Sequence, residues 1–277
     1  MTYFLKEKVK NLAKWYGFSP SRGLGQNFLV DEKVVGKVVD AAEIKDDDIV
    51  LEIGPGLGAL TMGLVEKAKQ VVAVEKDPKM VGILKNLFSK AENLEILESD
   101  IRKFSPEKDL LGYKAVGNLP FYLTAPVIRR LLETVKSKPR QMVFVVQKEV
   151  AQRITASPPE MSILAVSVQF YSKTKIISYI SKDSFWPRPK VDAAIIRIIP
   201  FSKPNLAKEE TELFFKVVKA GFSQPRKQLA NNLSKKLELN RVEVESWLME
   251  NNIQPERRAE TLAVEDWLKL AKSLKIN

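Results

Sequence analysis

Short apolar runs alternate with helical patterns over the first half of the chain. The apolar runs predict buried strands at 49–53, 71–74, 94–97, 115–116 and 142–146. Apolar residues that recur every three or four positions predict the helices between them, at about 59–68, 79–90 and 124–136. Because strands that alternate with helices form parallel sheets with crossover helices, we predict an α/β fold.

The pattern differs on both sides of this region. Residues 1–16 have the spacing of a basic amphipathic helix, and Asp31 is a suitable N-cap for a helix at 34–42. Two more apolar runs, near 176–180 and 193–199, have no long helix between them. These runs are candidates for an antiparallel end of the sheet.

After Pro200 the character of the sequence changes. Ser202-Lys203-Pro204-Asn205 has the composition of a linker, and from Glu209 onward apolar residues recur at helical spacing. At 277 residues the chain is long enough for one large and one small domain. We therefore expect residues 1–200 to form the α/β domain and residues 205–277 to form a small all-helical domain.

The chain is strongly basic, with a formal net charge of +11. Such an excess favours a polyanionic partner, for which nucleic acid is the first candidate; a generally basic soluble surface is the alternative. Most of the excess lies in the first 200 residues, so it is not confined to the predicted helical domain. Within that domain, Arg226 and Lys227 are candidate phosphate contacts, unless they belong to a solvated turn between helices.

The sequence contains neither Cys nor His. Their absence excludes disulfides, Cys/His zinc sites, Ser-His-Asp triads and Cys nucleophiles, and we expect no metal. An enzyme with this composition must catalyse a reaction that needs little acid–base help. The charged N-terminus has no signal-peptide core, and no apolar run reaches the ~18–20 residues that span a bilayer. We therefore expect a cytoplasmic protein with no membrane segment.

A glycine-rich turn follows the first predicted strand and opens a helix. It contains Gly54, Gly56 and Gly58, and glycines let the backbone approach a ligand beside the free N–H groups of a helix start. Glu75 ends the next strand, where a carboxylate suits the two hydroxyls of a ribose. The arrangement predicts a cofactor that contains a nucleoside.

The residues around the turn bear on the class of cofactor. Gly54, Gly56 and Ala59 fit a dinucleotide fingerprint, which would indicate a nicotinamide oxidoreductase. Glu52 precedes the turn, however, and a cationic cofactor such as S-adenosylmethionine tolerates a nearby carboxylate better than a pyrophosphate does. The absence of a proton-donating His also disfavours the oxidoreductase.

Polar residues at two further places complete the predicted cofactor site. Asp100 closes the third strand, where its carboxylate can accept a hydrogen bond from the amine of an adenine ring, although Asp also caps turns. Asn27 lies in the segment 24–29, which has many polar amides beside apolar anchors and is a candidate for covering the cofactor.

Asn118-Leu119-Pro120-Phe121 ends the fourth strand and suits a flat ring that carries an amine. The side-chain oxygen of Asn118 can accept a hydrogen bond from an exocyclic amine. Pro120 stiffens the turn, so that the carbonyl of Leu119 can point at the same amine. Phe121 offers a face on which a base can stack. A strand end with a proline turn and a core Phe is the structural alternative.

These segments occur in an order that resembles the KsgA/RsmA family of ribosomal RNA adenine dimethyltransferases. The similarity covers nearly the whole chain. It is carried by Gly25-Gln26-Asn27-Phe28-Leu29, Glu52-Ile53-Gly54-Pro55-Gly56, Val74-Glu75, Asp100, Gly117-Asn118-Leu119-Pro120, Val146-Gln147-Lys148-Glu149, Phe185-Trp186-Pro187, Phe222-Ser223-Gln224 and Arg258-Ala259-Glu260-Thr261-Leu262.

The resemblance implies a Rossmann-like, S-adenosylmethionine-dependent methyltransferase with a helical C-terminal domain that binds the ribosome. It implies two adjacent adenines near the 3′ end of 16S rRNA as the substrate, each methylated twice at N6 in the immature small subunit. A monomer is the simplest assembly. The implied site residues are Asn27, Leu29, Gly54, Gly56, Glu75, Asp100 and Asn118 for the cofactor; Asn118, Leu119, Pro120 and Phe121 for catalysis; and Phe121, Tyr122, Phe185, Arg226 and Lys227 for the RNA.

One position departs from the family pattern, and two alternative functions remain open. Phe121 stands where the family usually has Tyr, so the stacking face is kept and the hydroxyl is lost. A 23S rRNA adenine methyltransferase of the macrolide-resistance type shares the fold and motifs, whereas the C-terminal segments favour the small-subunit enzyme. A non-catalytic ribosome-assembly factor is the other alternative, and the intact glycine turn, Glu75 and Asn118 argue against it.

Overall fold

The computed structural model describes residues 2–21, 23–106, 110–202 and 206–274. The chain divides into two compact units. The first contains the residues up to Ala151 together with Lys173–Pro200, and the second contains Gln152–Ser172 together with the residues from Phe201 onward. No helix within the four described ranges is long and apolar enough to cross a membrane.

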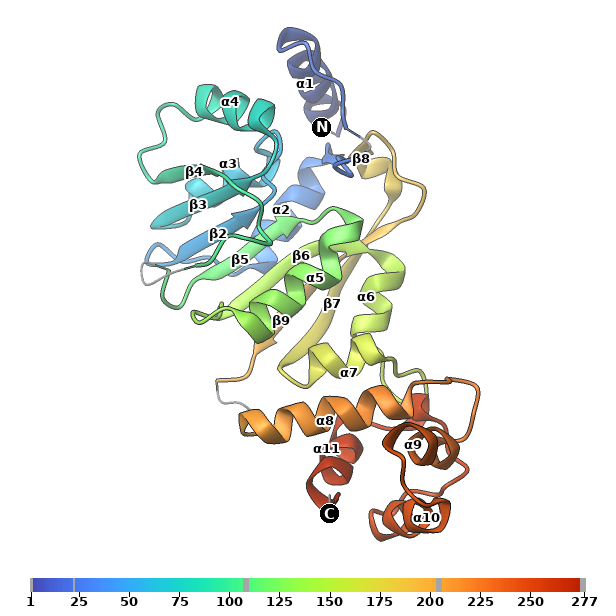
Figure 1. Ribbon diagram of the computed structural model, residues 1–277. Coiled ribbons are helices and arrows are strands. Elements are labelled where there is room, and N and C mark those ends of the chain that lie inside the picture. Colours follow the sequence, from blue (N-terminus) through green and yellow to red (C-terminus); the bar gives the residue numbers. More distant parts are fainter. Residues whose placement is uncertain (1, 22, 107–109, 203–205, 275–277) are drawn as a thin grey trace. The chain divides into compact units, whose positions relative to one another are not determined.

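The first unit is built on a seven-stranded sheet, which confirms the predicted α/β fold (Figure 1). The strands lie in the order β4-β3-β2-β5-β6-β9-β7. Their bounds are Ile49–Ile53 for β2, Gln70–Glu75 for β3, Leu94–Glu98 for β4, Lys114–Asn118 for β5, Gln141–Gln147 for β6, Ser172–Ile180 for β7 and Ala193–Pro200 for β9. Strands β2 to β6 pair in parallel, and β9 pairs antiparallel with β6, so the sheet has the antiparallel end considered above.

The parallel register brings the carboxyl ends of four strands to one edge of the sheet. Ile53 at the end of β2 pairs with Val74 of β3 and with Gly117 of β5. Glu75 at the end of β3 pairs with Glu98 of β4. The chain leaves β2 toward β3 on one side, and β5 lies on the other side. The strand order therefore reverses at this edge, which is where open α/β sheets bind ligands.

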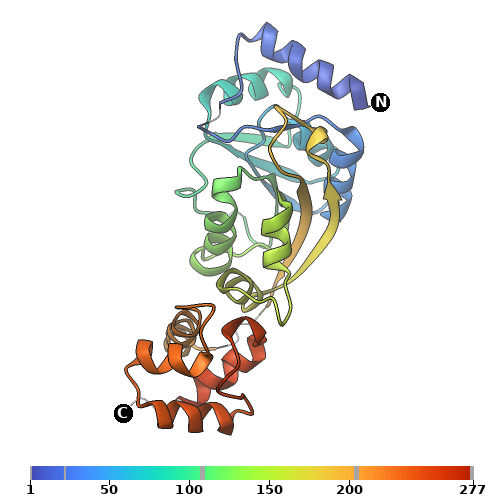
Figure 2. The same cartoon turned by 90° about the vertical axis from the view of Figure 1, so that its right-hand side faces the viewer.

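Helices cover both faces of the sheet (Figures 1 and 2). Helices α2 (Glu32–Ala41) and α3 (Ala59–Val65) lie on one face, and their Val38 and Leu64 are fully buried against strand residues such as Val116. Helix α5 (Thr124–Arg129) lies on the other face and continues as a π-helical turn at Arg130–Thr134. The predicted cap of α2 is confirmed, because the Asp31 carboxylate accepts from the first backbone N–H groups of that helix.

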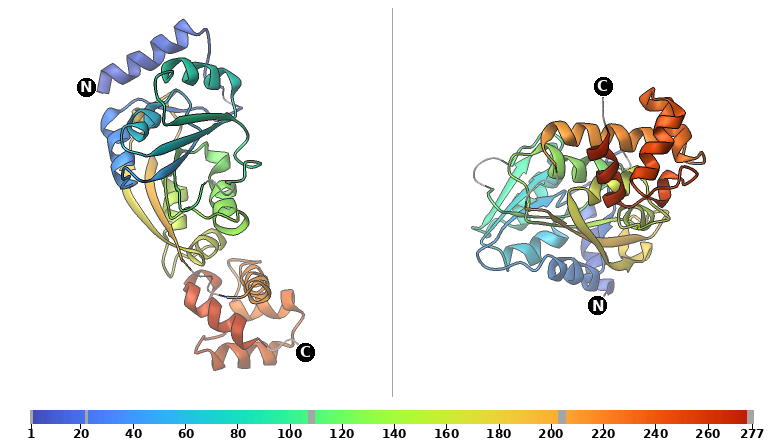
Figure 3. Two further views of the ribbon diagram at one scale, coloured as in Figure 1. Left: turned by 90° about the vertical axis from the view of Figure 1, so that its left-hand side faces the viewer. Right: turned by 90° about the horizontal axis from the view of Figure 1, so that it is seen from below.

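Helix α1 (Thr2–Trp15) lies along α4 (Pro78–Leu87), as Figure 3 shows in its left panel. Val9 and Ala13, which are one turn apart, are buried together with Met80 and Ile83 of α4. The predicted helix is therefore confirmed, and its Val9–Ala13 side packs on the fold, whereas the apolar Trp15 is exposed together with the polar residues.

One strand pair joins segments that are far apart in the sequence and was not predicted. Strand β1 (Phe28–Leu29) pairs antiparallel with β8 (Phe185–Trp186). Strands of two residues are too short to produce a recognisable apolar run, so the sequence pattern does not reveal them. The pair holds the segment after α1 against the loop that leads into β9.

The second unit is helical, as predicted for the C-terminal part of the chain. Its helices are α7 (Ile163–Gln169), α8 (Lys208–Gly221), α9 (Leu229–Leu237), α10 (Arg241–Glu250) and α11 (Val264–Ser273). Their common core contains fully buried residues from several helices, including Phe214, Leu233 and Trp267. Neither α7 nor α6 (Lys148–Ile154), which directly follows β6, was predicted, because both helices are short.

The expected domain boundary near residue 200 is wrong for one segment. Gln152–Ser172 precedes that boundary but belongs to the helical unit. Phe170 stacks on Phe214 with the ring centroids 4.3 Å apart, and Val166 is buried in the same core. These partners lie far along the chain, so local periodicity cannot pair them. Residues 203–205 of the expected linker lie outside the described residues.

Candidate active site at the carboxyl ends of the strands

A cavity of about 240 Å³ lies at the edge where the strand order reverses. Its walls come from the ends of β2, β3 and β5, from the segments that follow β4 and β5, and from residues of α1 and β1. The predicted cofactor and catalytic residues all line it, as do Tyr122 and Phe185: Asn27, Leu29, Gly54, Gly56, Glu75, Asp100, Asn118, Leu119, Pro120, Phe121, Tyr122 and Phe185. Arg226 and Lys227 belong to the other unit and do not line this cavity.

The glycine turn after β2 is held against the end of β3. The Gly54 N–H donates to the carbonyl of Val74 at 3.0 Å, and the Gly56 N–H donates to the Glu75 carboxylate at 3.1 Å. Gly56 has a φ of +59°, and a Cβ at this position would lie 3.1 Å from the ring of Phe28. A side chain at position 56 would therefore be strained and would also displace the segment that covers the turn.

Glu75 is buried and fully engaged by backbone donors. One carboxylate oxygen accepts from Gly56, and the other accepts from the N–H groups of Lys76 at 2.7 Å and Asp77 at 2.9 Å. Burial raises the pKa of Glu75 above its ordinary value, and these three hydrogen bonds oppose the rise. The N–H donors favour the ionised form, which is the form that can accept from a ribose diol.

Glu52 has an unpaired carboxylate oxygen inside the protein. Its Oε2 accepts from the Thr61 hydroxyl at 2.7 Å, whereas Oε1 has no partner among the described residues. Complete burial raises the pKa of Glu52 to about 8, and the nearby charge of Glu75 adds to the rise. A buried carboxylate oxygen without a donor is costly, so a cationic or hydrogen-bond-donating ligand in this cavity would be stabilised here. Sequence reasoning noted the acid but not its buried, unpaired state.

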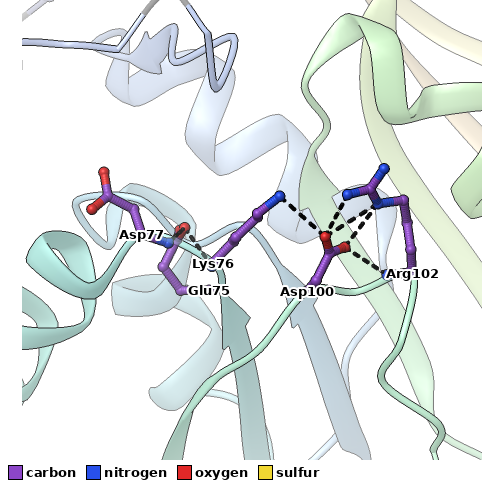
Figure 4. A network of polar contacts seen from close by, with 5 residues as sticks. All are labelled: Glu75, Lys76, Asp77, Asp100 and Arg102. Carbon is purple, nitrogen blue, oxygen red and sulfur yellow. Dashed lines mark hydrogen bonds and ion pairs between the residues drawn. The ribbon is translucent and has the colours of Figure 1, made fainter.

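Asp100 is surrounded by basic groups, as Figure 4 shows. Its carboxylate accepts from the backbone N–H of Arg102, from the Arg102 guanidinium at 2.6–3.2 Å, and from Lys76 Nζ at 3.1 Å. The Arg102 hydrogen bonds, the largest cause, hold the pKa of Asp100 well below its ordinary value even though burial opposes them. Lys76 and Arg102 were not among the predicted site residues. The available signal was their position: Lys76 directly follows Glu75, and Arg102 lies two residues after Asp100.

Asn118 ends β5 with its side chain oriented by the cofactor-covering segment. Its Nδ2 donates to the carbonyl of Asn27 at 2.8 Å, so its Oδ1 remains to accept from a ligand in the cavity. The N–H of Leu119 donates to the carbonyl of Val145, while no described residue donates to the carbonyl of Leu119. Two acceptors that are adjacent in the sequence are therefore left without protein donors at this edge of the cavity.

The aromatic side chains around the cavity differ in exposure. Phe121 is half-buried and Tyr122 is half-exposed, and both lie on the short helical turn after Pro120. Phe185 lines the cavity but is only 3% exposed, because it pairs in β8 and packs in the core under α2. Of the three, Tyr122 and Phe121 offer ring surface without rearrangement. The stacking role of Phe185 stays a prediction.

The segment that covers the cavity is fixed at both ends. Gln26 Nε2 donates to the Asp77 carboxylate at 2.8 Å, and the Asn27 side chain donates to the carbonyl of Gly25. On the other side, the Phe28 ring stacks on Trp186. The prediction that Asn27 lies over the cofactor rested on composition; the bond from Gln26 to the start of α4 was not foreseen.

Comparison with known proteins identifies the family. A family model described as "Ribosomal RNA adenine dimethylase" matches residues 17–275. Ribosomal RNA small subunit methyltransferase A of Dehalococcoides mccartyi (strain CBDB1) is 42% identical over 271 residues, which are 96% of this chain and 92% of that protein. The protein of the same name from Clostridium botulinum (strain ATCC 19397 / Type A) is 40% identical over 95% of this chain and 97% of its own length.

Two solved structures are similar over most of the chain. The 23S rRNA methyltransferase ErmE has a TM-score of 0.75 and 27% identity, covering 89% of this chain and 98% of its own. A dimethyladenosine transferase from Plasmodium falciparum has a TM-score of 0.72 and 28% identity, covering 86% of this chain and 94% of its own. Both support a Rossmann-like methyltransferase fold. Since the family model spans nearly the whole sequence and the relatives are 40–42% identical, the chain belongs to the ribosomal RNA adenine dimethylase family.

Proposed function

We propose that this protein transfers methyl groups from S-adenosylmethionine to N6 of two adjacent adenines near the 3′ end of 16S rRNA, two to each adenine. The observation that carries the proposal is the single cavity in which the acids at the strand ends meet Asn118 and Leu119. The acids suit the cofactor, and the two acceptors without protein donors suit an exocyclic amine. An enzyme without His suits a methyl transfer in which the leaving proton needs no strong base.

The cavity residues fit S-adenosylmethionine. Glu75 would accept from the ribose hydroxyls, Asp100 would accept from the adenine amine, and the glycine turn leaves room for the backbone to approach the ligand. Glu52 lines the cavity with Oε1 unpaired, and a positively charged part of the cofactor there would favour the ionised form of this acid over the neutral form that burial favours. When bound, S-adenosylmethionine supplies an electrophilic methyl group on a positively charged sulfur.

The residues at the end of β5 would hold the acceptor adenine. The N6 lone pair is delocalised into the ring, so the free amine is a weak nucleophile. If Asn118 Oδ1 and the Leu119 carbonyl accept from the two N6 hydrogens, they localise that lone pair and aim it at the methyl donor. Fixed orientation of the reactants can lower a barrier by about 7–11 kcal/mol in favourable cases. Phe121 would stack on the base, which must leave its own stack to enter.

The small-subunit substrate is favoured over the large-subunit one by the relatives. The two curated relatives are 40–42% identical and carry the small-subunit name, whereas the 23S enzyme ErmE is 27% identical. Arg226 and Lys227, in the turn between α8 and α9, would contact rRNA phosphates from the helical unit. We take a monomer as the active form.

The variant Asn118→Ala tests the proposed mechanism at saturating cofactor. We expect the turnover number on undermethylated small subunits to fall about 100-fold, as it does when a positioned polar group at a reacting centre is removed. Calorimetry with S-adenosylmethionine and the far-UV circular dichroism spectrum provide the controls for cofactor binding and folding. Near-normal turnover would remove Asn118 from the mechanism.

Mapping of dimethyladenine tests the substrate. Labelled methyl groups should enter 16S rRNA in small subunits from cells that lack this gene, and should not enter naked 23S rRNA. Incorporation into 23S rRNA would instead support the macrolide-resistance type of enzyme. Binding of cofactor without transfer to either RNA would support an assembly factor.

A further inference from the structure

The outer face of α1 carries an aromatic side chain with no packing role. Trp15 is 86% exposed, more than any other large apolar side chain in the described part of the chain. The apolar positions that fix α1 to the fold, Val9 and Ala13, lie on a different side of the helix. An indole ring exposed to this degree offers a large flat face with a polar N–H, on which a planar ligand can stack.

The exposed face that contains Trp15 is continuous with the active-site cavity. Lys8, Asn11, Leu12 and Trp15 are spaced three or four residues apart, so they share one side of the helix. They line a shallow hollow on α1, and Lys8 and Leu12 also line the cavity itself. Seven residues of helix separate Lys8 from Trp15, a rise of about 10 Å. A chain of nucleotides that enters the cavity would therefore pass within reach of Trp15.

The exposed surface of α1 carries more lysines than acidic residues. Lys8, Lys10 and Lys14 are exposed, and none of them forms an ion pair within the described residues. At 3.6 residues per turn, Lys14 lies about 100° and Lys10 about 140° around the helix from Trp15, so Lys8 is the lysine on the Trp15 side. Glu7 is the one acidic residue between positions 6 and 16 of the sequence, and it also lines the hollow.

We propose that the outer face of α1 binds single-stranded rRNA next to the target adenines, with Trp15 stacking on a base and Lys8 contacting a phosphate. The proposal rests on the function proposed above. An aromatic platform beside a basic side chain without an ion-pair partner, here Trp15 beside Lys8, is a combination that binds single strands with little dependence on base sequence. In this arrangement the cavity sets the rate of transfer, and α1 contributes to affinity for the RNA that leads into it.

A membrane surface is the other partner that attracts basic helices with a Trp, and the packing of α1 disfavours it. Helices that lie in a membrane interface insert a broad apolar face. In α1 that face is already buried against Met80 and Ile83 of α4. What remains outward is one ring among polar residues, which suits stacking rather than insertion.

The test measures kinetics on undermethylated small subunits for Trp15→Ala, Trp15→Phe and a matched control, Leu111→Ala. Leu111 is also a large apolar side chain of the first unit, is 72% exposed, and does not line the cavity. We expect Trp15→Ala to raise KM about tenfold, a difference of ~1.4 kcal/mol, and to leave kcat and the dissociation constant of S-adenosylmethionine unchanged. Trp15→Phe should stay close to the parent because it keeps a stacking face, and Leu111→Ala should not change KM.

A second measurement reports the contact directly and does not depend on methyl transfer. A short oligoadenylate should quench the tryptophan emission of the parent protein, and this quenching should be lost in Trp15→Phe. Unchanged KM in Trp15→Ala together with unchanged quenching in Trp15→Phe would overturn the proposal. Trp15-dependent sedimentation with vesicles of phosphatidylcholine and phosphatidylserine would overturn it in favour of a membrane. If the parent protein does not methylate small subunits, the proposed function fails, whereas normal methylation with no effect of Trp15 defeats this inference alone.

Discussion

Asp100 illustrates how a single residue in this site can be engaged by two competing groups. Its carboxylate is the expected acceptor for the adenine amine of the cofactor, yet Arg102 and Lys76 also donate to it. A carboxylate has about four acceptor positions, and the Arg102 side chain and backbone take most of them. The cofactor must therefore displace at least one donor or share it.

We predict that Arg102→Ala binds S-adenosylmethionine a few-fold more tightly than the parent protein, because the competing guanidinium is gone. The effect should be small, since the Arg102 side chain is half-exposed and its interaction is screened by water. Isothermal titration calorimetry provides the measurement. Lys103→Ala is the matched control: it removes the same charge one position further on without removing a donor to Asp100. Weaker binding by Arg102→Ala would show that Arg102 orients Asp100 instead of competing for it.

Glu52 gives a prediction for stability against pH. Its pKa is raised from 4.5 to about 8 in the folded protein. The folded state therefore binds this proton more tightly than the unfolded state does. The protonated group contributes its full stabilisation below about pH 4.5, and this contribution is lost as the pH rises through about 8. The variant Glu52→Gln lacks this dependence. We expect the free energy of unfolding of the parent, measured in urea and compared with that of Glu52→Gln at the same pH, to decrease steadily from pH 5 to pH 8.

Thr61→Val is the informative companion to that experiment. The Thr61 hydroxyl donates to the Glu52 carboxylate at 2.7 Å, and this hydrogen bond lowers the pKa of Glu52. Removing it should raise the pKa of Glu52 further, so the decline should begin near the same pH, about 4.5, and continue to a higher pH than in the parent. A parent protein whose stability relative to Glu52→Gln does not change over this range would contradict the buried, neutral carboxyl.

At the scale of elements, the contact between β2 and β5 depends on a glycine. A Cβ at Gly117 would lie 2.5 Å from the backbone carbonyl oxygen of Ile53, which cannot move without breaking the sheet. We expect Gly117→Ala to lower the free energy of unfolding by about 1–3 kcal/mol, the usual cost of overpacking a core. It should also weaken cofactor binding, since the following residue is Asn118.

Gly82→Ala is the control for that substitution. Gly82 lies inside α4, is exposed, and has no heavy atom within 4 Å of an added Cβ. The same change should therefore stabilise the protein by about 0.5–1 kcal/mol, because glycine disfavours helices. Thermal unfolding of both variants checks the pair. Equal effects would mean that the Gly117 position relaxes freely.

The elements that the sequence predicted well are those with a long, local signal. The strands around the glycine turn and the ends of β3 and β5 were placed by apolar runs with polar residues directly after them. Those ends then met at one edge because parallel strands align their carboxyl ends. The β1–β8 pair was missed because Phe28 and Trp186 meet through two-residue strands from distant segments. The Lys76 contact was missed because only the fold places Lys76, which follows β3, against Asp100, which follows β4.

At the scale of the whole molecule, the chain passes between its two units three times. It enters the helical unit at Gln152, returns to the sheet at Lys173 and leaves again after Pro200. The segment Gln152–Ser172 interrupts the sheet unit in sequence and contributes Val166 and Phe170 to the helical core. The apolar pattern does not indicate this exchange, because its long helical stretch begins only after residue 200. The helical unit is therefore built from two separate segments of the chain, whereas domains in series each contain one.

This arrangement predicts the behaviour of a shortened chain. A stop codon after Pro200 would preserve the whole sheet, and a boundary at 200 would suggest a methyltransferase domain that folds alone. In the structure, however, Phe170 stacks on Phe214, and Val166 lies in the same core, so the truncation exposes both. We expect the shortened chain to bind a hydrophobic dye and to associate on size-exclusion chromatography.

In the full chain, Phe170→Ala should lower the free energy of unfolding by about 3–5 kcal/mol. A monomeric, cooperatively unfolding fragment with parental affinity for S-adenosylmethionine would show that Gln152–Ser172 can be accommodated without the helical unit.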